Sequence, residues 1–367
     1  MIKRLFILSG LAIVAVVAHH AANWGFIVMS WVVEQPFAGI GPEQIGPVVY
    51  YSLTLIQKIT TFSVPAFLFV SGFFVAYAAR GEQSVLSWKM VRARITKLLI
   101  PYLIWSAIAF VYWGLNGSVY SPLRYVARLA YGGAFPEYYY VPLLIQLYLL
   151  ALVIVPLAKS HPGKVLIGAA AIQLVMIALN YAQIWVVDPR WSWLFMLAGR
   201  WALFTKWIFY FTLGIVISLD LMKVQLLTKY KWLFLGLAVV FLFVGLLENE
   251  AIYSFTGGEN WRSNPFTLSI TIYVICFVLA FLGFKDSAFP LAKTFHELNA
   301  HSFGIYLMHP LVILLIMPML SATVPFLFRY QFLFQPLLIV IAVGIPFLLM
   351  RLFKTKALAK YYSYLFG

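Results

Sequence analysis

The chain has 367 residues, of which 63% are hydrophobic and only 10% are charged, and its mean hydropathy is +0.93. A water-soluble domain of this length could not bury so much apolar surface, so the composition excludes a soluble protein and indicates an integral membrane protein. The formal net charge is +15 at pH 7. The basic residues collect in alternate loops and not on one face, which argues against a nucleic-acid-binding protein.

Apolar runs long enough to cross a bilayer predict an all-α polytopic protein with about ten transmembrane helices. The predicted spans are 5–33, 47–79, 93–116, 138–158, 163–186, 191–219, 230–247, 264–284, 299–322 and 332–353. The second and sixth spans are longer than one crossing needs, so we expect breaks at Pro65 and within 200–206.

The stretches between the spans are too short for a second domain, the longest lying between Asn116 and Glu137. We therefore expect one membrane domain over residues 1–367. The Pro- and Gly-rich stretch 35–47 is expected to be an external loop.

Lysine and arginine alternate with aspartate and glutamate from one side of the predicted membrane to the other. One side holds Lys3, Arg4, the cluster from Arg80 to Lys97, Lys159, Lys164, Lys223, Lys229, Lys231, Lys285, Lys293 and the tail from Arg351 to Lys360. The other side holds Glu34, Glu43, Glu137, Asp188, Glu248, Glu250 and Glu259. The positive-inside rule then predicts that both termini lie in the cytoplasm. We expect the protein to lie in the inner (plasma) membrane.

The first span carries two adjacent histidines, His19 and His20, deep inside an apolar run. An imidazole is costly in hydrocarbon unless it faces a polar cavity or a partner, so such a residue is a candidate functional group. Neighbouring residues on a helix point about 100° apart. We therefore expect only one of the two rings to face a cavity.

The remaining histidines carry weaker signals. His309 precedes a proline, so it is either a functional group inside its span or a side chain that bonds a carbonyl freed by the kink. His301, His161 and His296 are expected to be solvated. The six histidines form no HExxH pattern and the single cysteine, Cys276, excludes a disulfide framework, so we expect no metal site and no permanently bound cofactor.

Several segments, in a consistent order over nearly the whole chain, resemble the membrane acyltransferase-3 family. In the first span, residues 9–20 resemble the family motif in which ten residues separate an arginine from a catalytic histidine. His20 matches that histidine, but Ser9 stands where the family has arginine. Arg4 lies too near the start of the helix to replace it.

The other matching segments are VPAFLFVSGFFVAY at 64–77, RITKLLIPYLIWS at 94–106, YYYVPLLIQLYLL from Tyr138, FYFTLGI at 209–215 and HSFGIYLMHP at 301–310. The resemblance implies an integral membrane enzyme that moves an acyl group, acetyl or another short acyl, from acyl-CoA to a hydroxyl. The acceptor could be a glycan, a lipid-linked sugar or a terpenoid.

On this interpretation His20 is the general base that removes the hydroxyl proton. Ser71, Tyr306 and His309 are supporting residues, and Tyr306 or Ser71 is a candidate donor to the oxyanion. The phosphates of acyl-CoA are expected to bind three cations, Arg92, Arg94 and Lys97. The positive-inside rule alone also accounts for these cations.

Two other functions stay open from the sequence. A secondary transporter or flippase of an anionic or polar substrate is favoured by Lys58, Arg200 and Lys206, which lie at or near membrane depth. Against it, every carboxylate is expected in a loop or at a helix end. A haem protein that uses His20 and His309 as axial ligands is the third alternative.

Overall fold

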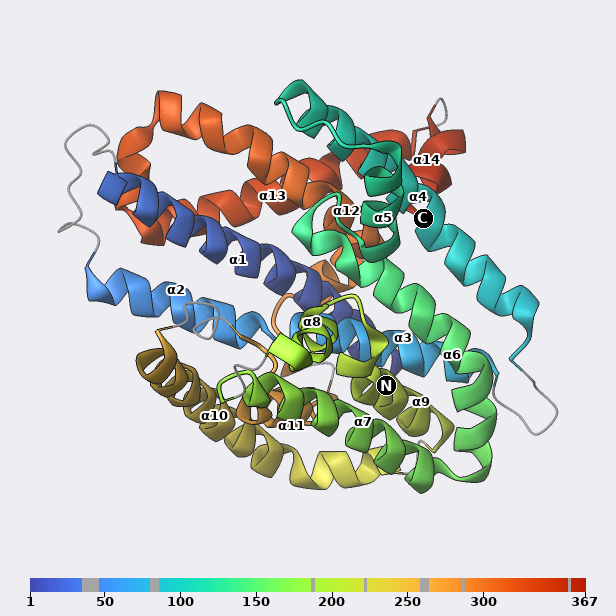
Figure 1. Ribbon diagram of the computed structural model, residues 1–367. Coiled ribbons are helices and arrows are strands. Elements are labelled where there is room, and N and C mark those ends of the chain that lie inside the picture. The colour runs from blue at the N-terminus through green and yellow to red at the C-terminus, as the bar shows by residue number, and fades with distance from the viewer. Residues whose placement is uncertain are drawn as a thin grey trace.

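The structure is a computed structural model that describes residues 1–34, 46–79, 86–185, 189–220, 223–257, 264–285, 288–355 and 358–367. All regular elements within these ranges are helices (Figure 1). They are α1 (Ile2–Glu34), α2 (Pro47–Thr60), α3 (Ser63–Ala78), α4 (Trp88–Leu115), α5 (Pro122–Tyr131), η2 (Pro136–Tyr139), α6 (Tyr140–Ser160), α7 (Pro162–Ala182), η3 (Pro189–Trp191), α8 (Ser192–Gly199), η4 (Phe204–Lys206), α9 (Ile208–Leu219), α10 (Lys223–Thr256), α11 (Leu268–Gly283), α12 (Ala292–Thr323), η7 (Pro325–Arg329), α13 (Gln331–Phe353) and α14 (Ala359–Phe366).

Within the described residues, 8 helical segments are long and apolar enough to cross a membrane. In the predicted spans 191–219 and 264–284 the apolar helices are shorter: α9 has 12 residues and α11 has 16. The all-helical, multi-pass fold is therefore confirmed. The count of ten spans and the cytoplasmic position of both termini stay predictions, and most of the predicted external loop at 35–47 lies outside the described residues.

Both expected helix breaks are present. α2 ends at Thr60 and α3 begins at Ser63, just before Pro65. The ring of Pro65 would clash with the carbonyl of residue 61 in a continuous helix, and proline has no N–H to donate. The second break separates α8, which ends at Gly199, from α9, which begins at Ile208.

The stretch between α4 and α6, the longest between predicted spans, contains the helix α5, which folds back along α4. The hydroxyl of Tyr102 on α4 donates to the Leu129 carbonyl at 2.6 Å. Gly132 then ends α5 with φ +81°, and a Cβ at this position would lie 2.5 Å from the Tyr138 carbonyl carbon. This left-handed turn, which glycine adopts without strain, directs η2 back into the protein.

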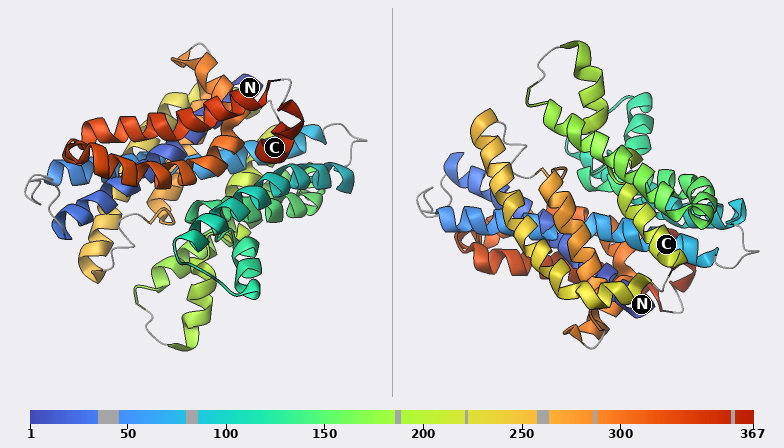
Figure 2. Two further views of the ribbon diagram at one scale, coloured as in Figure 1. Left: turned by 90° about the horizontal axis from the view of Figure 1, so that it is seen from above. Right: turned by 90° about the horizontal axis from the view of Figure 1, so that it is seen from below.

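Helix α1 lies in the middle of the bundle and packs against α2, α3, α11, α12 and α13. Figure 1 shows it between α13 and α2, and the two views of Figure 2 show it covered from both sides by later helices. Among residues 2–29, all side chains except Lys3 and Asn23 are buried or half-buried. The polar side chains in the middle of α1 therefore face protein or an internal cavity.

Helices α3 and α9 cross at backbone contact through two glycines. A Cβ on Gly214 would lie 2.0 Å from the Phe69 carbonyl oxygen, and a Cβ on Gly72 would lie 2.1 Å from the Phe211 carbonyl oxygen. Such close approach of two helices is typical of small residues in membrane bundles.

We predict that Gly214→Ala lowers the free energy of unfolding by about 1–3 kcal/mol, because the added methyl group forces α3 and α9 apart. Gly168→Ala on α7 is the matched control, since a Cβ at Gly168 meets nothing within 4 Å. The control should be neutral or slightly stabilising through helix propensity. Thermal unfolding in detergent measures both, and equal melting temperatures for the two variants would contradict the crossing.

Candidate active site

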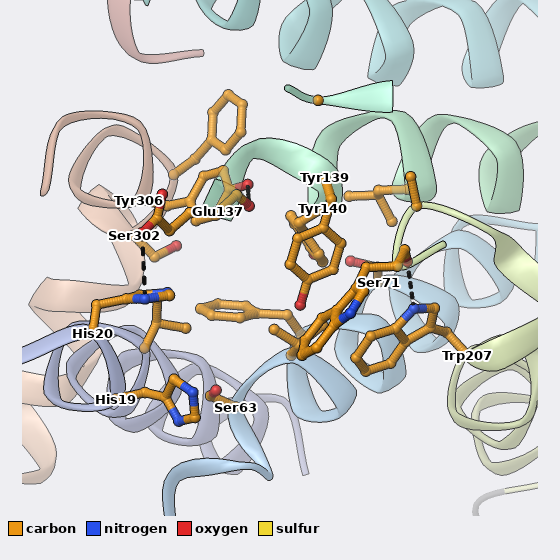
Figure 3. A pocket seen from close by; sticks show the side chains of 18 of the residues that line it. His19, His20, Ser63, Ser71, Glu137, Tyr139, Tyr140, Trp207, Ser302 and Tyr306 are labelled. Carbon is orange, nitrogen blue, oxygen red and sulfur yellow. Dashed lines mark hydrogen bonds and ion pairs between the residues drawn. The ribbon is translucent and has the colours of Figure 1, made fainter. Parts of the chain in front are cut away.

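A cavity of about 760 Å³ lies at the centre of the bundle. Its walls come from α1, α3, α12, the segment around η2 and the loop between α8 and α9 (Figure 3). On α1 the lining runs from Phe6 to Asn23, which corresponds to about 25 Å of helix at 1.5 Å per residue. The cavity therefore extends along most of the part of α1 that is long enough to cross a bilayer core of roughly 30 Å.

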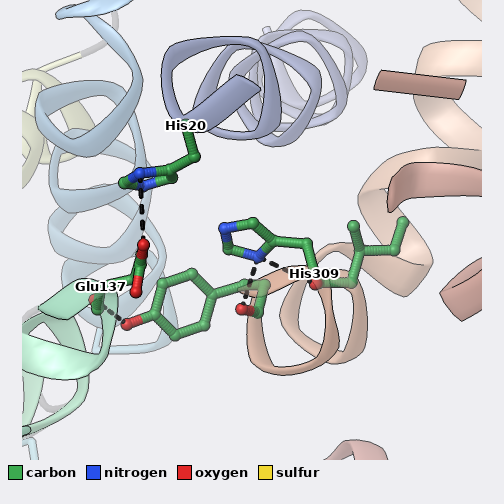
Figure 4. Close-up of polar contacts among 5 residues, drawn as sticks. His20, Glu137 and His309 are labelled. Carbon is green, nitrogen blue, oxygen red and sulfur yellow. Dashed lines mark hydrogen bonds and ion pairs between the residues drawn. The ribbon is translucent and has the colours of Figure 1, made fainter. Parts of the chain in front are cut away.

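His20 and Glu137 face each other in this cavity. The Nδ1 atom of His20 lies 3.4 Å from Oε1 of Glu137, and their side chains are 25% and 15% exposed (Figure 4). Both residues line the cavity. The pair thus combines a ring that can exchange protons with a carboxylate that can stabilise its charged form.

Two tyrosines hold the Glu137 segment against α12. The hydroxyl of Tyr306 on α12 donates to the backbone carbonyl of Glu137 at 2.5 Å. In return, the hydroxyl of Tyr138 donates to the Leu307 carbonyl at 2.5 Å. These buried hydrogen bonds fix the position of η2 and so the direction of the carboxylate.

The second carboxylate oxygen of Glu137, Oε2, is buried and has no hydrogen-bond partner among the described residues. A buried carboxylate oxygen without a donor is costly. Burying this carboxylate oxygen costs less free energy when a positive charge forms next to the carboxylate, as when His20 takes a proton. The environment of Glu137 therefore fits a carboxylate that supports proton transfer.

His309 lies directly behind His20, with the two ring centroids 5.3 Å apart. Its Nδ1–H donates to the Tyr306 carbonyl at 2.8 Å. Pro310 lacks the N–H that would otherwise bond this carbonyl. The sequence-based alternative that His309 bonds a freed carbonyl is therefore what the structure has, and the ring still contacts His20 (Figure 4).

The expectation that only one histidine of the pair faces a cavity is wrong. His19 also lines the cavity, and its Nδ1 lies 3.1 Å from Thr60 Oγ1 and 3.3 Å from the Gln57 carbonyl. The cavity is bounded by the α2–α3 break on one side of α1 and by η2 on the other. It is wide enough for two rings about 100° apart to reach it.

Ser9, which stands at the family's arginine position, is buried and lines the cavity on the same face of α1 as His20. The two are 11 residues apart, about three turns of helix. Among the described residues in the cavity wall, Arg200 is the one with a cationic side chain. It comes from the loop between α8 and α9, and Ser9 is not replaced by a cation on α1.

The three predicted acyl-CoA cations lie on α4. Arg94 donates through Nη2 to the Phe74 carbonyl at 3.1 Å, and its guanidinium lies 5.9 Å from the Tyr148 ring centroid. Phe74 and Tyr148 both line the cavity. Arg92 and Lys97 are exposed on α4 and do not line it. The acyl-CoA role of these cations stays a prediction.

Two further expectations are wrong. Carboxylates are present inside the bundle: besides Glu137, Glu248 on α10 accepts hydrogen bonds from the hydroxyls of Tyr181 and Ser269. His301 is buried and not solvated, because its Nε2 is bonded to Lys354 Nζ at 2.8 Å. Both errors arose because hydropathy along the chain does not show which segments fold inward.

Glu137 is the residue of the site that the sequence did not reveal as functional. Hydropathy placed it at the end of a connecting stretch, on the side opposite to the basic loops. The signal that could have found it is local: two glycines, Gly132 and Gly133, precede the acidic residue, and three tyrosines follow it. That pattern indicates a tight turn followed by an aromatic helix start.

The fold is thus that of a multi-pass membrane protein with a histidine–carboxylate pair on the wall of an internal cavity. The family model described as an acyltransferase domain matches residues 6–351. The chain therefore belongs to the acyltransferase-3 family and is a membrane acyltransferase that transfers groups other than aminoacyl groups.

Curated relatives come from Staphylococcus aureus. A probable poly-beta-1,6-N-acetyl-D-glucosamine export protein of strain MRSA252 is 22% identical over 264 residues, which are 70% of this chain and 71% of that protein. The proteins of the same description in strains MSSA476 and MW2 are 31% identical over 112 residues, 29% of either chain. No solved structure matches the chain significantly.

We predict that Tyr306→Phe lowers acyl transfer about 10-fold, because a small displacement of a group in the site is costly in rate. The lost hydrogen bond should reduce the free energy of unfolding by only about 1 kcal/mol. Tyr51→Phe, at an exposed position on α2, is the matched control. Wild-type turnover in Tyr306→Phe would show that the bond to the Glu137 carbonyl does not position the site.

Proposed function

We propose that this acyltransferase moves an acetyl or other short acyl group from cytoplasmic acyl-CoA to a hydroxyl of a glycan or lipid-linked sugar, with His20 as general base. The observation that carries the proposal is the His20–Glu137 pair in a cavity that extends along α1 from Phe6 to Asn23. The Staphylococcus aureus relatives are named as export proteins of a glycan, poly-beta-1,6-N-acetyl-D-glucosamine, which supports a carbohydrate acceptor over a terpenoid.

The reaction needs one base and no redox chemistry. The acceptor hydroxyl oxygen attacks the thioester carbonyl carbon while His20 Nε2 takes the hydroxyl proton. The carbon–sulfur bond of the tetrahedral intermediate then breaks. His20 returns its proton to the sulfur, so the products are the O-acyl ester and free coenzyme A.

Glu137 is assigned the role of orienting His20 and stabilising its charged form. With Nδ1–H directed at Oε1, the Nε2 atom of neutral His20 carries the lone pair that accepts the proton. The separation of 3.4 Å is long for a hydrogen bond, and such contacts commonly shorten when substrate binds. His309 contacts the other side of the ring and limits its rotation.

The sequence offered Tyr306 and Ser71 as oxyanion donors. Tyr306 already directs its hydroxyl hydrogen at the Glu137 carbonyl. Ser71 lines the cavity on α3 beside the Tyr140 hydroxyl, across the cavity from His20 (Figure 3), so we assign the oxyanion to neither side chain. Tyr306 is accordingly a positioning residue in this mechanism.

The protein is placed in the inner membrane by this proposal, and acyl-CoA enters the cavity from the cytoplasm. Arg92, Arg94 and Lys97 on α4 bind its phosphates, and its pantetheine arm passes the apolar wall that Phe6 and Phe74 contribute. Without a cation at Ser9, the α4 cluster carries the electrostatic part of donor binding.

His20→Ala should reduce acyl transfer by about 10²- to 10⁴-fold, the usual contribution of a general base. Transfer from radiolabelled acyl-CoA by purified protein in detergent measures it. His161→Ala, an exposed histidine at the junction of α6 and α7, is the control. If His20→Ala retains the activity of the His161→Ala protein, the base is another group.

For Glu137→Gln we expect a fall of about 10²-fold or more in turnover with little change in the Michaelis constant for acyl-CoA, since the amide cannot stabilise protonated His20. Glu297→Gln removes a carboxylate that contacts Arg351 at 3.5 Å on the outside of the bundle, and it should leave turnover unchanged. Equal turnover in the two variants would remove Glu137 from the mechanism.

Export is the second candidate function, and the name of the Staphylococcus aureus relatives as probable export proteins favours it. The carboxylate in the cavity also removes the sequence argument against a transporter. The two functions separate in detergent, where no gradient exists. Loss of the acyl group from acyl-CoA to an added glycan shows transfer, whereas glycan movement in vesicles without acyl transfer shows export alone.

A further inference from the structure

One end of the cavity has an aromatic wall that the transfer chemistry does not use. It consists of Tyr139 and Trp207, which Figure 3 labels, and of Trp201. Tyr139 is only two residues from Glu137 in the chain, and its ring centroid lies 5.4 Å from that of Trp201 at an interplanar angle of 72°. The wall therefore begins next to the His20–Glu137 pair.

The wall is held rigidly by hydrogen bonds to the backbone of the loop between α8 and α9. The indole N–H of Trp207 donates to the Trp201 carbonyl at 2.8 Å, and Gln146 Nε2 on α6 donates to the Ala202 carbonyl at 2.7 Å. The Trp201 ring also packs edge-on against Phe266, with centroids 5.0 Å apart. A preformed surface of this kind binds a ligand without the cost of ordering a loop.

Trp201 is nevertheless 41% exposed, and Arg200 beside it is exposed and lines the same end of the cavity. An aromatic face next to a guanidinium is amphipathic: the ring offers an apolar surface, and the guanidinium offers five N–H donors. A pyranose ring has the complementary form, because its C–H groups make an apolar face and its hydroxyls and amide carbonyl accept hydrogen bonds at the rim.

The opposite end of the cavity differs in character. There the lining includes Phe6, Phe74 and Leu98 together with Ser9, and no cationic side chain among the described residues. The apolar side chains of that end suit the apolar parts of a thioester. The two ends of the cavity thus match two different substrates.

We propose that Trp201, Tyr139 and Arg200 form the acceptor subsite, which binds a pyranose ring of a glycan chain and directs one of its hydroxyls at His20. This inference rests on the proposed function, since it names where the acceptor of that reaction binds. Trp201 supplies the stacking face, Tyr139 sets the distance to the Glu137 segment, and Arg200 bonds the polar rim of the sugar.

The test measures glycan binding apart from catalysis. Calorimetric titration of a β-1,6-linked N-acetylglucosamine oligosaccharide uses the full chain in detergent, with His20→Ala in every sample so that no turnover occurs. Trp201→Ala should raise the Kd about 10-fold, the equivalent of about 1.4 kcal/mol, and Trp201→Phe by much less because it keeps an aromatic face. Trp193→Ala is the matched control, because Trp193 is 57% exposed on neighbouring α8 and does not line the cavity.

In proteins that keep His20, Trp201→Ala should raise the Michaelis constant for the glycan and leave that for acyl-CoA unchanged. A Kd that is the same in Trp201→Ala and Trp193→Ala overturns the subsite, as does the absence of binding by the protein with Trp201 intact. Melting temperatures of the two variants show whether both are folded.

The outcomes also separate this inference from the proposed function. Trp201-dependent glycan binding without any acyl transfer from acyl-CoA supports the subsite and contradicts the transfer reaction. Acyl transfer to the glycan with an unchanged Michaelis constant in Trp201→Ala supports the reaction and overturns the subsite.

Discussion

The site depends on one buried attachment, the pair of tyrosine hydroxyls that fasten η2 to α12. Tyr306 donates to the Glu137 carbonyl and Tyr138 donates to the Leu307 carbonyl, both at 2.5 Å. Placing a carboxylate inside a membrane bundle costs free energy. The segment that carries Glu137 stays inside because the two hydrogen bonds would be lost if it moved out of the bundle. Those bonds are why an acidic residue from a connection between helices can face a histidine on α1.

The segment that these hydrogen bonds hold also connects the catalytic base with the proposed acceptor subsite. Glu137 points toward His20, whereas Tyr139, on the same 3₁₀ turn, belongs to the aromatic wall. A turn of four residues therefore supplies both the partner of the base and part of the acceptor subsite. The distance between the reacting hydroxyl and the base is then set by a short, rigid segment, which is the condition for proximity to contribute to rate.

Much of the fold could be predicted from the sequence, because long apolar runs in a membrane protein leave few alternatives to helices. The breaks at Pro65 and within 200–206 followed from proline geometry and excess length. His20 could be selected as a candidate because a titratable group in an apolar run needs a reason. These are properties that neighbouring residues in the chain determine.

The partner of His20 could not be predicted in this way. Glu137 reaches the cavity because α5 folds back along α4 and Gly132 turns the chain inward, and both depend on contacts between distant segments. His19 was misjudged for a related reason, since the angle between two side chains on α1 does not give the width of the space around the helix. Pattern analysis identifies groups that need partners, and tertiary packing decides which partners they receive.

The proline after His309 has an effect beyond the local helix geometry. Pro310 has no N–H to donate, so the Tyr306 carbonyl accepts a hydrogen bond from Nδ1–H of His309 instead. This bond selects one tautomer of the His309 ring. In that tautomer the buried Nε2 atom carries a lone pair. The backbone at Pro310 thus determines the tautomer of the ring that contacts His20, and it does so before any substrate binds.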